Sequence, residues 1–154
     1  RHTDAVTSYR AAEVAAERAE ANGDPGGLWL RIMARFGVGC GLLAAPHGFA
    51  HAARYYEETA PLCQKLGDPR LELESYRCAA IAHELAKAYR PAWDVVVKAL
   101  GVVDRLDDAQ REQAMLVPLA DAMLRLVKTR ELSSYRGAVE TELRRRKMRG
   151  TEWA

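Results

Sequence analysis

The apolar and polar positions of this chain repeat at an interval of 40 residues. Sliding the sequence by this interval superimposes three large residues, Phe36, Tyr76 and Leu116. Other positions recur in the same order, namely Cys40, Ala80 and Ala120, then Leu43, His83 and Met123, then Ala52, Ala92 and Leu132. A period of this length, with large and small positions in constant order, is typical of helix pairs that stack into a solenoid. The pattern therefore predicts an all-α fold.

Within each interval, apolar residues spaced three and four apart predict two helices with a short break between them. We expect about seven helices, over residues 4–21, 27–45, 46–65, 70–89, 91–105, 108–128 and 132–147. Pro61 and Pro118 fall inside two of these helices and predict a bend or a break, because proline removes one backbone hydrogen bond. We expect a single domain over residues 1–154, with an end helix of a preceding unit (1–24), repeat units 27–66, 67–106 and 107–147, and a tail (148–154).

Several short motifs indicate where these helices begin and end. Asn22-Gly23 and Gly67 suit the left-handed conformation in which many helices stop. Asp24-Pro25 and Asp68-Pro69 each predict a capping carboxylate followed by the first helical residue, and Pro91 also suits a first helical position.

Composition and charge exclude several classes of protein. The formal charge of +2 is too small to indicate nucleic-acid binding by the whole chain. No apolar run reaches the length of a membrane span, so we expect no membrane contact. Cys40, Cys63 and Cys78 are widely spaced and odd in number, and we interpret them as buried free thiols in a reducing compartment, the cytoplasm. Because the sequence starts at Arg1, we expect it to be a fragment of a larger protein.

Small residues recur where neighbouring helices of a stacked array come closest, at Cys40, Ala80 and Ala120 in the first helices and at Ala52 and Ala92 in the second. Aromatic residues Phe49 and Tyr89 fall at the turn between paired helices, and residues 53–60, ARYYEETA, have the character of a second helix. On these positions the region 27–147 resembles the tetratricopeptide-like (TPR-like) repeats, in a variant longer than their usual unit of about 34 residues. The third unit departs from the pattern at Thr129, Leu132 and Arg136, which suits a terminal unit with a solvated outer face.

The resemblance implies a right-handed superhelical stack of antiparallel helix pairs, in which the first helix of each pair lines a concave side. Such families mostly bind a peptide or a protein segment. Longer versions rich in alanine and arginine are similar to the sensor and interaction regions of large bacterial transcription regulators and signalling ATPases.

The register of the family, placed on this chain, assigns eight residues to a concave binding groove. They are Arg77, Ile81, Glu84 and Leu85 from the helix 70–89, and Val117, Asp121, Leu124 and Arg125 from the helix 108–128; the helix 27–45 adds Ala34, Gly41 and Ala45. Charged side chains that fix register, together with apolar area, are what a bound peptide needs. The alternative is that the four charged residues only pair with one another across neighbouring helices.

Two histidine patterns could suggest a metal site. Residues 83–87, HELAK, begin like a zinc-protease helix, but Lys87 stands where the second histidine ligand is required. We therefore interpret His83 as a core residue. His47 and His51 are four residues apart on one helical face, yet the sequence offers no obvious third ligand. We expect no metal.

Other chemical patterns have structural interpretations. The glycine-rich run 36–41 lacks the preceding strand that a phosphate loop requires, so its glycines are expected to let helices approach closely. Trp29 and Phe36 are expected to fill space between helices, although Trp29 could instead be exposed because it lies near a helix start. The basic run 144–147 complements the dipole of the last helix. The longer run 144–149 could contact phosphates, but Met148 interrupts it and Glu140 and Glu142 precede it, so we expect a solvated end rather than direct binding of nucleic acid. No nucleophile, base and acid can be grouped from the sequence, and we expect neither an enzyme nor a cofactor.

Two hypotheses for function follow. The first is a non-enzymatic scaffold in a bacterial regulatory or signalling protein, which binds a protein or peptide partner through the concave face. The second is a ligand-sensing or dimerising segment of a transcription regulator. A homodimer would use the alanine-rich face of the helix 4–21, because the end of a solenoid exposes apolar surface.

Overall fold

The computed structural model of the chain describes residues 2–114 and 116–151, and all regular secondary structure in these residues is helical. The elements are α1 (His2–Ala21), α2 (Gly27–Leu43), α3 (Phe49–Leu66), α4 (Pro69–Leu85), α5 (Tyr89–Val103), α6 (Asp108–Gln113), α7 (Leu116–Leu126), the 3₁₀ turn η1 (Ser133–Tyr135) and α8 (Arg136–Arg145). The predicted all-α class is confirmed. Among the helices of the described residues, none is long and apolar enough to cross a lipid bilayer.

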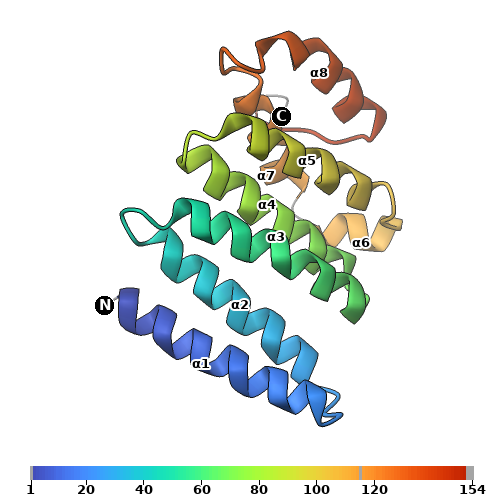
Figure 1. Cartoon of the computed structure of the whole chain (residues 1–154). Coiled ribbons are helices and arrows are strands. Elements are labelled where there is room, and N and C mark those ends of the chain that lie inside the picture. Colours follow the sequence, from blue (N-terminus) through green and yellow to red (C-terminus); the bar gives the residue numbers. More distant parts are fainter. Residues whose placement is uncertain (1, 115, 152–154) are drawn as a thin grey trace.

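Helices α1 to α5 form a layered stack in which the chain reverses direction at every turn (Figure 1). Each of these helices packs against its neighbours in sequence. Helix α7 packs against both α4 and α5, and α8 packs against α7 and η1. The first five layers therefore follow the simple antiparallel order that the sequence predicts, while α7 bridges two earlier helices.

The signals at helix ends are confirmed at three of the predicted positions. Gly67 ends α3 in the left-handed conformation, with a φ of 78°, and Gly23 follows α1 with a φ of 79°. The carboxylate of Asp68 caps α4 by accepting hydrogen bonds from the N–H groups of Arg70 (3.0 Å) and Leu71 (3.2 Å). The prediction for Asp24 is wrong, because Asp24 accepts from the N–H of Gly26 in a preceding turn.

The prolines act differently from the prediction. The single helix over 108–128 is wrong: it is divided into α6 and α7, because Ala114 is extended, with φ −79° and ψ 147°. Pro118 therefore lies in the first turn of α7, where a missing N–H costs no intrahelical hydrogen bond. Pro91 likewise lies in the first turn of α5, which begins at Tyr89. Helix α3 continues through Pro61 to Leu66.

Three other predicted helices are too long. Helix α3 begins at Phe49, three residues after its predicted start at residue 46. Helix α4 ends at Leu85, and Lys87 then adopts a left-handed φ of 57°. The last predicted helix, 132–147, consists of η1 followed by α8, and Leu132 before them is fully buried.

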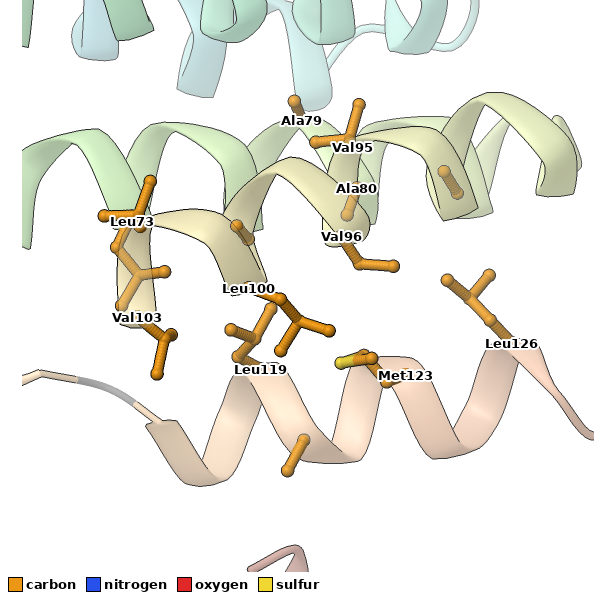
Figure 2. Close-up of a cluster of buried hydrophobic side chains, with 14 of the residues drawn as sticks. Leu73, Ala79, Ala80, Val95, Val96, Leu100, Val103, Leu119, Met123 and Leu126 are labelled. Atoms are coloured by element: carbon orange, nitrogen blue, oxygen red, sulfur yellow. The ribbon is translucent and has the colours of Figure 1, made fainter. Parts of the chain in front are cut away.

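The main core lies where α7 packs beneath α4 and α5. Val96 and Leu100 of α5 point toward Leu119 and Met123 of α7 (Figure 2). Small residues of α4, such as Ala80, let α5 approach closely and are themselves buried. Each large apolar side chain buried in this way contributes about 1.5–3 kcal/mol to folding. These side chains therefore hold α7 against α4 and α5.

Candidate functional site

The eight residues assigned to the groove lie on α4 and α7, two helices that are in contact. Leu85, Val117 and Arg125 are exposed, whereas Leu124 is buried. The other four, Arg77, Ile81, Glu84 and Asp121, are half-buried. The set therefore combines exposed apolar side chains with charged groups near the surface.

Glu84 of α4 and Arg125 of α7 form a two-pronged ion pair. The Nε and Nη2 atoms of Arg125 donate to the two carboxylate oxygens of Glu84 at 3.0 and 3.1 Å. The hydrogen bond that Arg125 donates to Glu84 raises the pKa of Arg125. Because both side chains are partly exposed, such a pair contributes at most about 1 kcal/mol. The alternative that charged residues pair across helices holds for these two residues.

The other two charged residues have different partners. Arg77 donates from Nε to Glu74 of its own helix at 2.8 Å, and this bond raises the pKa of Arg77. Asp121 accepts two hydrogen bonds from Thr151, from the backbone N–H at 2.7 Å and from the hydroxyl at 2.6 Å. The hydroxyl bond is the main cause that lowers the pKa of Asp121. The C-terminal segment of the chain itself thus occupies part of the predicted groove.

A trough of about 440 Å³ lies beside these residues, between α2, α4 and the break that separates α6 from α7. Trp29, which is 48% exposed, lines it together with Arg77 of the predicted set. The alternative that Trp29 is exposed therefore holds, whereas Phe36 packs against Tyr56, with 5.8 Å between ring centres. The complete lining is Trp29, Met33, Asp68, Arg70, Leu71, Leu73, Glu74, Arg77 and Ala114.

A second apolar crevice, of about 340 Å³, separates α5 from α8. Trp93, Val97 and Met123 contribute apolar wall, and Asp104, Glu142 and Arg146 contribute an ion-pair cluster. A third crevice, between α1 and α2, is lined almost wholly by apolar side chains: Tyr9, Ala12, Ala15, Ala16, Ala19, Leu30, Met33 and Ala34.

A buried charged cluster joins α1, α2 and α3. Arg35 of α2 donates to Glu13 (2.5 Å) and Glu58 (3.2 Å), and its Nε donates to the hydroxyl of Thr59 at 2.8 Å. The guanidinium also lies over the ring of Tyr55, 4.4 Å from its centre. Arg35 and Glu13 are 7% and 8% exposed. Since these groups satisfy one another, the cluster holds three helices together and leaves no group directed at a ligand.

The histidines and cysteines do not converge on one site. Within residues 2–114 and 116–151, no three metal-ligating side chains are grouped closely enough to hold an ion. His47 and His51 are both exposed, and His83 is hydrogen-bonded to Glu57 of α3 at 3.3 Å, which lowers the pKa of Glu57.

All three cysteines, which lie in the described part of the chain, are free thiols. Burial raises the pKa of Cys63 and of Cys78 to about 12. The prediction of a buried thiol is wrong for Cys40, which is exposed.

Of the eight predicted residues, Glu84 and Arg125 are thus joined by an ion pair between α4 and α7, and Arg77 lines the trough together with Trp29. Comparison with known proteins gave no match to the chain among family models, curated proteins or solved structures.

Proposed function

We propose that this chain is a peptide-binding module whose groove is formed by α2, α4 and α7. The trough beside Trp29 is the observation that carries the proposal. Tryptophan and arginine are enriched at the residues that dominate protein–protein affinity. A half-exposed Trp29 next to Met33 offers apolar area, and the Arg77–Glu74 pair offers donors and acceptors to a peptide backbone.

We propose a right-handed, TPR-like superhelix as the architecture of this module. The antiparallel order of α1 to α5 supports it, as does the burial of the small repeat residues Ala80, Ala92 and Ala120. In this arrangement α2, α4 and α7 are the first helices of successive units and share one side. The role is binding, without a catalytic step, in a bacterial regulatory or signalling protein; the buried thiol of Cys63 supports a cytoplasmic location.

The test begins with peptides selected from a random displayed library on the immobilised chain. Their affinities are then measured by fluorescence anisotropy for the wild type and for Trp29→Ala and Arg77→Glu. Loss of a central tryptophan from an interface costs about 2 kcal/mol or more, which is roughly a thirtyfold loss of affinity.

Two matched variants control for general effects of mutation. Leu30→Ala removes a side chain that is 49% exposed next to Trp29 but lines the α1–α2 crevice instead. Arg54→Glu reverses an exposed charge on α3. Both are expected to bind the selected peptides like the wild type. Selected peptides that bind Trp29→Ala and Arg77→Glu with unchanged affinity would show that the groove is assigned to the wrong surface.

A ligand-sensing role is the second candidate, and the apolar crevice between α5 and α8 favours it. Gly101 lines this crevice, and a side chain added there meets open space. An apolar small molecule bound there should raise the melting temperature of the wild type, and Gly101→Phe should remove that rise by filling the crevice. A rise that persists in Gly101→Phe would place the ligand elsewhere.

Homodimer formation is supported by the apolar crevice between α1 and α2. Sedimentation velocity over a range of concentrations measures it directly. Ala15→Glu places a charge on this face and should leave only monomer; a dimer that survives the change uses another surface.

A further inference from the structure

Gly150 and Thr151 lie against the α7 face of the proposed groove, and Thr151 has a 3₁₀ conformation. Thr151 donates its backbone N–H to one carboxylate oxygen of Asp121 and its hydroxyl to the other. Any residue except proline can offer the first donor, but the second comes from a hydroxyl on a short side chain, which serine and threonine have. The carboxylate therefore recognises both a backbone and a side chain.

Gly150 fits this place because it has no side chain. A Cβ atom at this position would lie 2.7 Å from Oδ1 of Asp121 and 2.8 Å from Cδ1 of Leu124. The oxygen in question is the one that accepts the N–H of Thr151, so a larger residue would displace the carboxylate from its bond. Gly137 on α8 differs, since a Cβ there meets nothing within 4 Å.

The chain arrives at this face through the cap of α8. Lys147 has a left-handed φ of 55°, and the N–H of Met148 donates to the carbonyl of Leu143, which together form a Schellman cap. Met148 is 2% exposed and belongs to the core. The core thus anchors Met148, and beyond it Thr151 donates two hydrogen bonds to Asp121.

We propose that the surface formed by Asp121 and Leu124 is a receptor site for a peptide in which glycine precedes threonine or serine. Gly150 and Thr151 of the chain occupy this site, and a partner segment with the same pattern competes with them. This inference rests on the proposed function, which supposes that a peptide partner exists. It adds the sequence pattern of the partner segment that binds to α7.

The experiment uses the full chain in three forms: wild type, Gly150→Val and the control Gly137→Val. The probe is a fluorescent hexapeptide with the sequence of residues 149–154, RGTEWA. Gly150→Val should release the segment, and the site should then bind the hexapeptide at least tenfold more tightly than the wild type or Gly137→Val. Adding Asp121→Ala to Gly150→Val should abolish this binding, and the peptides RVTEWA and RGVEWA should bind at least tenfold more weakly.

Release of the segment is measured separately, as the rate of tryptic cleavage after Arg149. Thr151→Pro is a second releasing variant, because it removes both the N–H and the hydroxyl that Asp121 accepts. Cleavage at the wild-type rate in both releasing variants overturns the inference, since the contacts with Asp121 then do not hold the segment. Equal hexapeptide affinity for wild type and released chains, or affinity unaffected by Asp121→Ala, also overturns it.

The proposed function can fail independently. If the affinity of the library peptides depends on Trp29 but is unchanged by Asp121→Ala, the proposed function stands and the receptor site at Asp121 is wrong. The opposite result is that hexapeptide binding requires Asp121, while Trp29→Ala affects none of the selected peptides. The receptor site on α7 would then stand, and the trough beside Trp29 would not be the main groove.

Discussion

Replacing Arg35 by methionine tests whether the buried cluster between α1, α2 and α3 holds the N-terminal layers together. Methionine retains much of the volume but removes the charge, and Glu13 keeps only a 3.4 Å hydrogen bond from Tyr55. Removing one partner of a buried ion pair costs about 3–5 kcal/mol, because the other charge stays buried. Glu58 is largely exposed and adds little, so we expect a loss near the lower end, about 3 kcal/mol.

The assay is urea unfolding, followed by circular dichroism. The free energy of unfolding is obtained by linear extrapolation to zero urea, with the same dependence on urea concentration for every variant. Arg31→Met is the matched control on the same helix. Arg31 is half-buried and pairs with Glu17 and Glu20, and Glu20 keeps Lys65 as a second partner, so replacing Arg31 should cost less than replacing Arg35. Glu13→Leu combined with Arg35→Met removes both charges and should recover most of the loss, since apolar residues replace buried pairs well. Equal losses for Arg31→Met and Arg35→Met, or no recovery in the double variant, would refute the reasoning.

Three further predictions concern single contacts. Because hydrogen bonding from Thr151 lowers the pKa of Asp121 below its ordinary value of 3.8, this contact stabilises the fold above that pH and is lost as the pH falls through the lower pKa; the Thr151 amide proton should titrate by NMR with a midpoint below 3.8, and a higher midpoint would contradict the bond. Asp68→Ala removes the cap of α4 and should lower the free energy of unfolding by about 1 kcal/mol in the same urea assay, whereas an unchanged value would mean that the cap adds nothing. Cys63, with a pKa raised to about 12, should resist iodoacetamide in the folded chain while exposed Cys40 is alkylated, as peptide mass spectrometry can show, and equal labelling would contradict the burial.

The repeat pattern predicted the layers because close packing imposes a residue size that is visible in the sequence. Ala80 and Ala120 are 40 residues apart, as are Ala52 and Ala92, and all four are buried almost completely. Helices that meet at such positions must have small side chains there, so the signal is present in each unit independently. The stop at Gly67 and the cap at Asp68 were predictable for a similar reason, since both depend only on nearby backbone.

Contacts between residues far apart in the sequence could not be predicted in the same way, because no repeat or local motif marks them. Glu13 and Arg35 each look like a charge on a mostly apolar helix, and only the fold shows that they meet. The bond between Asp121 and Thr151 spans 30 residues and follows no period. The sequence predicts a bend or break at Pro118, whereas the break lies at Ala114, because proline is tolerated in the first turn of a helix.

The late position of α7 in the sequence has a consequence for synthesis of the protein. Helices α1 to α5 pack on their neighbours in sequence, so they can form in order as the chain leaves the ribosome. The side of α5 that carries Val96 and Leu100 then stays uncovered until Leu119 and Met123 of α7 have emerged (Figure 2). During that interval the nascent chain exposes an apolar surface of the kind that chaperones bind and that promotes aggregation.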